Sequence, residues 1–577
     1  MTSQRLDDAL RRATAALFAE LTPAGHWVGE LSSSALSTAT AIVALGAVDR
    51  ERNADLIAGG RRWLAEHQNA DGGWGDTVKS KSNISTTALC WAALGGKDER
   101  STAWLARAAG SIGELVPAIE RRYGQDRTFS VPILMHLAIC GRIDWLKVPA
   151  LPFELAALPH QIFGALQLPV VSYALPALIA IGQAIHHHAP SRNPLARGVR
   201  ELARGKTLRV LQSIQPENGG FLEATPLTSF VTMALASAGH GDHPVARQGV
   251  EFLRASVLAD GSWAIDTNLA TWVTTLAIKA LAPQPGALSP EQKLTLREWL
   301  LGQQYRVEHP YTHAAPGGWA WTNLPGGVPD ADDTPGALLA LLALGIVDPP
   351  TRLAGQRGVR WLLDVQNRDG GIPTFCRGWG ALPFDRSSPD LTAHTLRAWS
   401  AWLPQLDAAL AARTRRGIAR GLAFLEEQQR DDGSWLPLWF GNEHAPDDEN
   451  PLYGTAHVIL ALRELGGRAF PLPPHLLPRA QRWLVDRQDA SGGWSGAPGG
   501  PTSTEETALA VEALAGTEHV RAVERGTAWL IARIEADAWR EPAPIGFYFA
   551  KLWYFERLYP QVWTVGALGK VAALRPF

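Results

Sequence analysis

Seven residues, Gln68-Asn69-Ala70-Asp71-Gly72-Gly73-Trp74, form a turn motif that recurs along the chain. Close copies occupy residues 366–371, 429–435 and 488–494, and weaker ones end at Phe221, Trp263 and Trp319. In the second half the copies recur roughly every 50 to 60 residues, a period that is typical of helical-pair repeats. The spacing therefore predicts a protein built from repeated pairs of helices.

Each turn separates two helical segments. A run such as Arg482-Trp483-Leu484 precedes the turn, and a polar start followed by apolar residues, as at 504–509, comes after it. Ser, Thr and Asp suit a helix N-cap because their side-chain oxygen accepts a free backbone N–H. The run 336–344 is apolar on most faces, which indicates a buried helix. We expect an all-α protein of two α/α-barrel domains, residues 1–268 and 269–577, in which the Gln and Trp side chains of the Gln…Gly-x-Trp turns tie neighbouring units together.

The composition narrows the function classes. A chain of 577 residues is long enough for more than one domain. Its formal net charge is -2, from 54 Lys+Arg against 56 Asp+Glu, so no charge excess indicates binding to nucleic acid. The three cysteines are few and far apart, which favours a reducing compartment over a disulfide framework. The charged N-terminus lacks the apolar core of a secretion signal, so we expect a protein that is not secreted.

Residues 155–191 contain no Asp, Glu, Lys or Arg. Pro159, Pro169 and Pro176 interrupt this stretch, whereas a membrane span needs about 20 continuous apolar residues. We therefore expect a buried or membrane-facing surface helix. This interpretation places the protein at the cytoplasmic side of a membrane, as a peripheral or monotopic protein.

Two copies of the repeat begin their inner helix in an unusual way. One reads Val328-Pro329-Asp330-Ala331-Asp332-Asp333-Thr334-Pro335, and the other reads Ser388-Pro389-Asp390-Leu391-Thr392-Ala393-His394. By the logic of the repeat, both starts lie at the same end of the barrel on neighbouring inner helices. The sequence therefore predicts a cavity floor that brings together Asp330, Asp332, Asp333, Asp390 and His394.

Three acids within four residues exceed what helix capping needs, since one acid suffices for that. Crowded carboxylates cannot all ionise, so at least one keeps its proton, and in a dry pocket this proton can pass to a very weak base. Asp390 and His394 are four residues apart and share a helix face, so Asp390 is expected to orient and charge the imidazole. The imidazolium would then stabilise the carboxylate left behind. We interpret Asp332 as a proton donor, with helix capping as the simpler alternative.

A metal site is the weaker interpretation of the same residues. An Asp-rich cluster can hold Mg²⁺, but these acids are packed into one helix start, and no second Asp or Glu cluster is evident on an inner helix. A protein-prenylating barrel would need a Zn²⁺ site of Asp, Cys and His, and Cys376 is not placed among such ligands. We therefore expect no metal.

The combination of motifs resembles the squalene-hopene cyclases and related class II terpene cyclases. The repeated turns are similar to the signature repeats of that family, and residues 330–334 are similar to its acid motif, in which the middle Asp protonates an alkene. Residues 390–394 resemble its supporting Asp…His segment, and the motifs follow in this order over nearly the whole chain. The resemblance implies a reaction without a metal or organic cofactor, in which Asp332 is the acid and Asp330, Asp333, Asp390 and His394 set its acidity.

Aromatic residues extend the resemblance. Trp321 matches a family aromatic that faces the growing cation, and Trp272 resembles another, although the residue after it, usually Asp, is Val273. Aromatic faces stabilise a desolvated carbocation by about 1 to 2 kcal/mol per contact and do not quench it. The other positions that the resemblance assigns to the cavity are Trp439 and Tyr453 in the ring-stacking region, Phe375 and Cys376 near the acid, and Tyr548 in the aromatic C-terminal cap.

The activity that the resemblance implies is the cyclisation of a linear isoprenoid, squalene before others, to a polycyclic triterpene. The intact Asp…His segment with Trp439 and Tyr453 favours this substrate. The middle region, at about residues 189–220, is trimmed against the family, which favours the alternative of a shorter isoprenoid diphosphate held by Mg²⁺ and basic residues. A non-catalytic or zinc-dependent prenyl-binding barrel is the second alternative. Expected partners are the isoprenoid and a membrane surface, with a homodimer left open and no nucleic acid.

Overall fold

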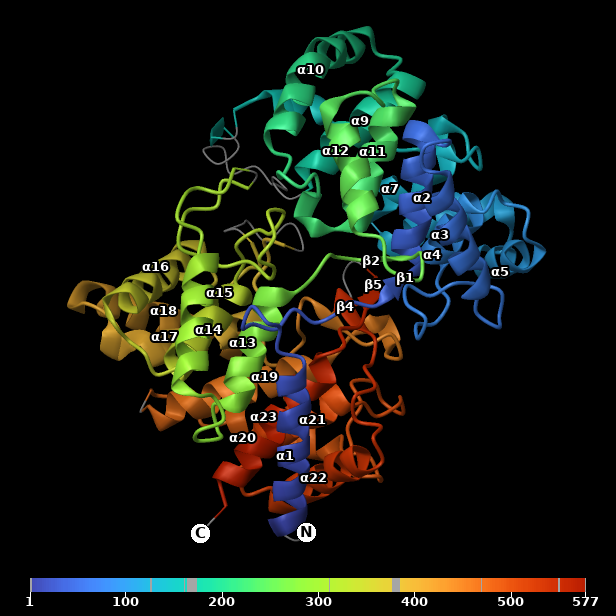
Figure 1. Cartoon of the computed structure of the whole chain (residues 1–577). Helices are drawn as coiled ribbons and strands as arrows, with labels where there is room; N and C mark the ends of the chain where they lie inside the picture. The colour runs from blue at the N-terminus through green and yellow to red at the C-terminus, as the bar shows by residue number, and fades with distance from the viewer. Residues whose placement is uncertain are drawn as a thin grey trace.

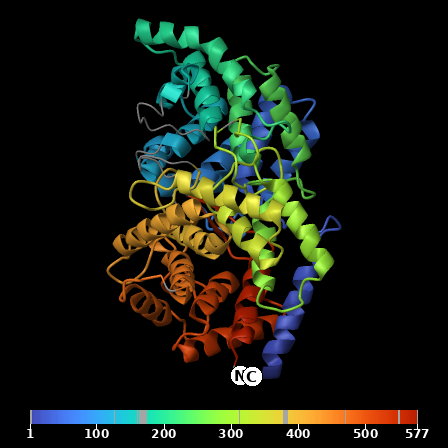
Figure 2. The same ribbon diagram turned by 90° about the vertical axis from the view of Figure 1, so that its left-hand side faces the viewer.

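The computed structural model describes residues 3–124, 127–159, 161–162, 174–310, 312–375, 384–468, 470–547 and 551–575. These residues are mostly helical and form two groups of helices, one above the other in Figure 1 and again in the turned view of Figure 2. Cys376 and Tyr548 lie outside the described residues. The fold is all-α, as the sequence predicts.

The lower group is an α/α-barrel whose inner helices form a closed ring. Each inner helix packs against the next, and the last packs against the first. The ring consists of α13 (Ala270–Leu281), α15 (Asp333–Ala343), α17 (Pro389–Trp402), α19 (Pro451–Gly467), α21 (Thr504–Leu514) and α23 (Tyr559–Ala573). Around it lie the outer helices α14 (Pro290–Gln303), α16 (Pro349–Val365), α18 (Ala408–Glu427), α20 (Leu476–Asp486) and α22 (Val520–Glu535).

The N-terminal helix α1 (Ser3–Ala19) completes the outer layer of this lower barrel. It packs against α22 and α23, and Figure 1 shows it beside α22. The buried apolar residues from Leu6 to Leu31 share one core with those from Ala264 to Leu568. The predicted division into residues 1–268 and 269–577 stays a proposal. In this division, residues 6–31 belong to the first unit by sequence but pack in the core of the second.

The upper group is a second barrel. Its inner helices are α2 (Ala35–Asp49), α4 (Ile84–Ala93), α7 (Arg127–Ile139), α9 (Leu175–His188) and α11 (Thr225–Ser237), and α11 packs back against α2. Its outer helices are α3 (Ala54–Glu66), α5 (Glu99–Ala109), α6 (Leu115–Tyr123), α10 (Pro194–Ser213) and α12 (Pro244–Ala255). The core runs from Ala35 to Trp263 and also takes in Val328 and Phe375 from the lower barrel's loops.

Part of the charge-poor stretch 155–191 can be placed. Residues 160 and 163–173 lie outside the described residues, and α9 is buried from Ile179 to His186. Within the described ranges, the structure has no helix that is both long and apolar enough to cross a membrane. Short 3₁₀ helices occupy Ile112–Glu114, Trp145–Lys147, Phe153–Ala157, Phe221–Glu223, Leu403–Gln405 and Pro446–Asp448.

The recurring turns that contain Trp share an indole hydrogen bond. The indole N–H of Trp74 donates to the carbonyl of Leu64 at 2.8 Å, and the pairs Trp263–Leu253, Trp435–Leu425 and Trp494–Leu484 repeat this bond. The amide of Gln429 donates to Gly433 in its own turn and to Leu476 at the start of the next outer helix, both at 3.0 Å. The Gln side chain therefore joins neighbouring units, whereas the indole of the turn is bonded to the outer helix of its own unit.

A threonine hydroxyl fixes the depth of five inner helices of the lower barrel against their turns. The Oγ1 atom of Thr334 accepts the backbone N–H of Trp319 at 3.0 Å. Equivalent bonds join Thr274 to Trp27, Thr392 to Ile372, Thr455 to Trp435 and Thr507 to Trp494. The residues two positions before these threonines therefore share one level at the N-terminal end of the ring, and they are Trp272, Asp332, Asp390, Tyr453 and Glu505.

Small antiparallel sheets lie between the two barrels. β1 (Ser33–Ser34) pairs with β2 (Trp263–Ala264), and Ser33 lies opposite Ala264. β4 (Ile545–Phe547) lies between β3 (Phe440–Gly441) and β5 (Leu552–Tyr554), with Phe440 opposite Phe547 and Ile545 opposite Tyr554. Figure 1 shows β4 and β5 at the junction of the barrels, where they bring aromatic residues of the chain's end to the site.

Candidate active site

The acid motif is the start of inner helix α15, and its first acid caps that helix. The Oδ1 atom of Asp330 accepts the backbone N–H groups of Asp332 and Asp333, each at 2.8 Å. One carboxylate therefore does the capping, which leaves the carboxyl groups of Asp332 and Asp333 for other roles. Burial raises the pKa of Asp330 to about 7, although these two backbone bonds favour its ionised form.

Asp332 lines the cavity and touches the imidazole of His394. Its Oδ1 atom lies 2.7 Å from Nδ1 of His394, and its side chain is 22% exposed. Burial raises the pKa of Asp332 to about 7, against the opposing charge of Lys279. Burial and the charges of Asp330 and Asp332 raise the pKa of Asp333 well above its ordinary value. Near neutral pH this acid cluster therefore retains protons.

The positive charge beside the acid lies on Lys279 and not on His394. The Nζ atom of Lys279 is 3.2 Å from Nε2 of His394, and burial, with Lys279 and Arg397 nearby, lowers the pKa of the imidazole well below its ordinary value. An ammonium can only donate, so Nε2 accepts and the neutral ring carries its proton on Nδ1, toward Asp332. The expectation of an imidazolium is wrong for this reason.

Asp390 has another partner than the one expected. Both ring nitrogens of His394 are taken by Asp332 and Lys279, while Oδ1 of Asp390 accepts the hydroxyl of Ser388. Burial raises the pKa of Asp390 to about 7. Tyr453 is buried beside this group, close enough that the charges of Asp332 and Asp390 contribute to the raised pKa of its phenol.

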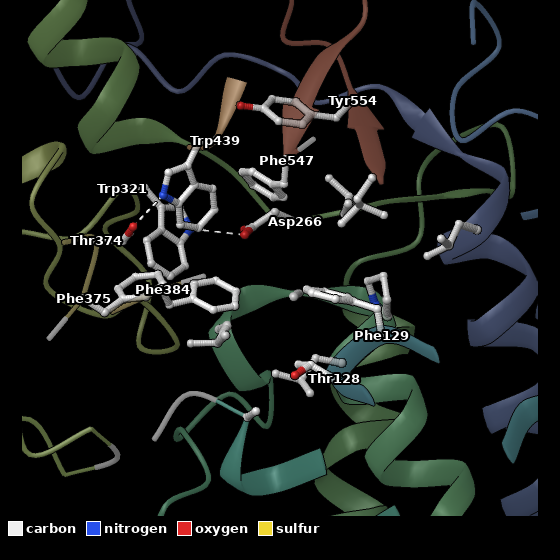
Figure 3. A pocket seen from close by; sticks show the side chains of 18 of the residues that line it. Thr128, Phe129, Asp266, Trp321, Thr374, Phe375, Phe384, Trp439, Phe547 and Tyr554 are labelled. Carbon is white, nitrogen blue, oxygen red and sulfur yellow. Dashed lines mark hydrogen bonds between the residues drawn. The ribbon is translucent and has the colours of Figure 1, made fainter. Parts of the chain in front are cut away.

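Hydrogen bonds hold the indoles of the cavity wall in place. The N–H of Trp321 donates to Oδ2 of Asp266 at 3.1 Å, that of Trp439 to Oγ1 of Thr374 at 2.6 Å, and that of Trp272 to the hydroxyl of Tyr559 at 3.1 Å. The bonds fix the orientation of each ring and satisfy its one polar group. Figure 3 shows the bonds of Trp321 and Trp439 as dashed lines.

Further aromatic rings surround these indoles. Phe375 lies with its ring centroid 6.2 Å from that of Trp321 and 5.9 Å from that of Trp439. Phe384 lies 5.6 Å and Phe547 4.4 Å from Trp439, both edge to face. In Figure 3 these rings form one side of the cavity, and Phe129 lies across from them. A cation in this space would meet aromatic faces on several sides.

The cavity itself has a volume of about 310 Å³ and lies between the barrels, with walls from both. The lower barrel supplies Asp330, Asp332, Asp333 and the aromatic wall, and the upper barrel supplies mainly apolar residues such as Ile133 and Phe230. Among the described residues that line it there is neither lysine nor arginine. Across the described ranges, no three His, Cys, Asp or Glu side chains are grouped so as to hold a metal ion.

The site includes charged residues that the sequence did not predict, among them Lys279 and Asp266. Lys279 is the single charged residue of α13, and this isolated lysine in an apolar inner helix was a usable signal. Asp266 precedes α13 and lines the cavity, and burial together with the charge of Glu223 raises its pKa well above the ordinary value. Of the predicted cavity residues, Trp272, Trp321, Phe375 and Trp439 line the cavity, and Tyr453 lies behind it.

Comparisons with known proteins match most of this chain. The model of the squalene-hopene cyclase N-terminal domain matches residues 10–219, and that of the squalene-hopene cyclase C-terminal domain matches residues 269–573. Enfumafungin synthase of Hormonema carpetanum is 26% identical over 92% of this chain, which spans 45% of that protein's length. The squalene–hopene cyclase of Alicyclobacillus acidocaldarius is 26% identical over 95% of this chain and 94% of its own.

A solved structure with the same fold is the ent-copalyl diphosphate synthase from Streptomyces platensis. The two structures agree with a TM-score of 0.54 over 99% of each chain. Their sequences are 19% identical, so this likeness concerns the fold alone.

Proposed function

Since the chain belongs to the squalene-hopene cyclase family, it is a terpene cyclase, and we propose that Asp332 starts its reaction by protonating the terminal alkene of a linear isoprenoid. The observation that carries this proposal is the 2.7 Å contact of Asp332 with His394, at the edge of a cavity walled by aromatic rings. The contact occupies Oδ1, which leaves Oδ2 for the substrate.

In the proposed first step, the proton on Oδ2 of Asp332 passes to the CH carbon of the terminal alkene. The π electrons form the new C–H bond and leave a tertiary carbocation, which the next double bond attacks as a ring closes. The N–H of His394 donates to the carboxylate that remains, and such a bond to a charge that develops in the transition state favours the reaction. Protonated Asp332 is the reactive form, so the rate falls as the pH rises through its pKa of about 7.

The aromatic wall supports the later steps of this proposal. As rings close, the charge moves along the substrate past Trp272, Trp321 and Trp439. Each indole face stabilises a desolvated cation by about 1 to 2 kcal/mol and adds no nucleophile. The cascade ends when the last cation loses a proton or takes up water.

We propose squalene as the substrate to test first. A diphosphate group in an apolar cavity needs cations or many donors around it, and the described lining residues include neither lysine nor arginine. The lining suits a hydrocarbon better. The shorter isoprenoid diphosphates stay the alternative, because the copalyl diphosphate synthase of Streptomyces cyslabdanicus is 30% identical over 44% of this chain.

A product assay tests this choice. Purified protein in detergent is incubated with squalene, and separately with geranylgeranyl diphosphate and Mg²⁺, and extracts are analysed by gas chromatography–mass spectrometry after dephosphorylation. A new isomer or hydrate of squalene supports the triterpene proposal. Turnover of the diphosphate alone contradicts it and moves the substrate to the shorter isoprenoids, with Asp332 still the acid.

We also propose that the far end of the upper barrel touches a membrane surface, where such a substrate dissolves. Helix α10 exposes Leu195 by 80%, Val199 by 55% and Leu202 by 87%, on one face at helical spacing. The helix also carries Arg197, Arg200, Arg204, Lys206 and Arg209 against Glu201. An apolar face bordered by basic residues is typical of a helix that lies in a membrane interface. Figure 1 shows α10 at the end of the molecule farthest from the lower barrel.

The double variant Leu195→Ser and Leu202→Ser is expected to bind anionic phosphatidylserine vesicles at least about 10-fold more weakly, because burying one leucine contributes roughly 1.5 to 3 kcal/mol. Co-sedimentation at several lipid concentrations measures the change. The matched control replaces Leu294 and Leu353, which are each 50% exposed on α14 and α16 of the other barrel. Equal binding by both double variants would contradict the membrane contact at α10.

A further inference from the structure

A lysine lies behind the catalytic histidine, inside the lower barrel. Lys279 comes five residues after Thr274 in α13, and His394 comes two residues after Thr392 in α17. Asp332 lies two residues before its own threonine, Thr334. Because these threonines fix the depth of the inner helices, Asp332, His394 and Lys279 lie at successive levels down the barrel, at about 1.5 Å of rise per residue.

Lys279 contacts the side chains of His394 and Trp272, which lie at neighbouring levels of the barrel. Its Nζ atom lies 3.2 Å from Nε2 of His394, on the opposite side of the ring from Asp332. The same ammonium lies 5.6 Å from the ring centroid of Trp272, whose ring is 6.3 Å from that of His394. Lys279 therefore belongs to the group that holds the acid, and it meets this group through His394 and Trp272.

Charged residues from the other inner helices lie around Lys279. Arg397 of α17 pairs with Glu464 of α19 at 2.7 Å, and Glu512 of α21 and Lys570 of α23 lie near this pair. Burial and Arg397 lower the pKa of Lys279 to about 8, while the charges of Asp332, Glu512 and Asp333 oppose this shift. His457 and Tyr453 of α19 and Asp390 of α17 face the same interior. At neutral pH Lys279 therefore keeps most of its charge.

We propose that Lys279 is a positioning residue that makes Asp332 a stronger acid through His394. Its ammonium donates to Nε2, which holds the N–H of the neutral ring on Nδ1, facing Asp332. When Asp332 gives up its proton, that N–H and the cation behind it stabilise the new carboxylate. Lys279 touches neither the substrate nor the reacting atoms. This inference rests on the proposed function, since it needs Asp332 as the acid.

The test compares Lys279→Met, which keeps the length of the side chain, with Lys279→Arg, which keeps the charge and the donor. For Lys279→Met we expect kcat to fall about 10- to 100-fold with little change in KM, as for other partners that orient a functional side chain. The descending limb of the pH profile should move to higher pH, because the charge of Lys279 lowers the pKa of Asp332. Lys279→Arg should recover part of the rate and return the limb toward its wild-type position. Lys570→Met, a loss of charge on another inner helix, is the control and should retain the wild-type profile.

A second readout does not depend on turnover. With ¹⁵N-labelled histidine, the NMR titration of His394 should show a higher pKa in Lys279→Met, because the lysine charge lowers it. An unchanged pH profile in Lys279→Met would overturn the inference. A loss of rate that Lys279→Arg does not relieve would also overturn it, if the His394 titration is unchanged as well. If the wild-type protein converts no isoprenoid, the proposed function fails, and the His394 titration alone decides whether the charge of Lys279 lowers the pKa of this ring.

Discussion

Asp332→Asn is expected to lower kcat by at least about 10³-fold, which is near the upper end of what a general acid contributes. The asparagine keeps the shape of the side chain and can still accept the N–H of His394, but it has no proton to give to an alkene. The loss is measured by titrating enzyme into substrate and analysing extracts of the reactions by gas chromatography–mass spectrometry. The substitution acts on the one group that the mechanism requires to release a proton.

The same variant should remain folded and melt at no lower temperature than the wild type. The pKa of Asp332 is raised in the folded state, so its contribution to stability is present at acidic pH and is lost as the pH rises through about 7. A neutral amide avoids this loss at alkaline pH. The matched control is Asp364→Asn, at an exposed aspartate that pairs with Arg413 on the outer layer, which should keep full activity. An active Asp332→Asn enzyme would refute the assignment of the proton donor.

His394→Phe is expected to lower kcat about 10²- to 10³-fold, because it removes the N–H that meets the carboxylate formed in the first step. Phenylalanine keeps an aromatic ring against Trp272 and differs mainly in its polar atoms. The loss should be smaller than for Asp332→Asn, since the acid itself remains. Steady-state rates with the same substrate measure it.

His457→Phe is the matched control for this variant. His457 lies two residues after Thr455 on the neighbouring inner helix, which is the same repeat position as that of His394. Its ring is tilted against that of Tyr453, with the centroids 4.4 Å apart. It is expected to change the rate by no more than a few-fold. Equal losses in both variants would mean that any histidine at this level matters only for packing, which would contradict the role given to His394.

The repeat made much of the fold predictable from the sequence. The Gln and Trp of the turns at 429–435 and 488–494 make the same bonds, so the motif specifies an outer helix, a turn and an inner helix there. The same regularity puts the two unusual copies on the neighbouring helices α15 and α17. For this reason Asp332 and His394, 62 residues apart, could be expected to lie close together.

The electrostatics of the site could not be predicted in the same way. Lys279 lies 115 residues before His394, and no local pattern shows that its side chain turns toward that ring. If the position of Lys279 is not known, an imidazolium charged by Asp390 is the simplest way to place a cation beside the acid. Likewise, Asp266 binds the indole of Trp321 from 55 residues away, in a segment outside the repeated turns. Contacts of this kind depend on how the helices pack, which the repeat specifies only in part.

The measurement that tests the central claim most directly is the incorporation of deuterium from the solvent. The enzyme is equilibrated in D₂O and given the isoprenoid that it converts, and the product is examined by mass spectrometry and ¹³C NMR. If Asp332 protonates the terminal alkene, each product molecule carries one deuterium on the methylene carbon that was the CH carbon of that alkene, next to the carbon that bears the two methyl groups, and Asp332→Asn gives no such product. A cyclised product without deuterium at that position would contradict the account, because the cation would then have formed without protonation of the alkene.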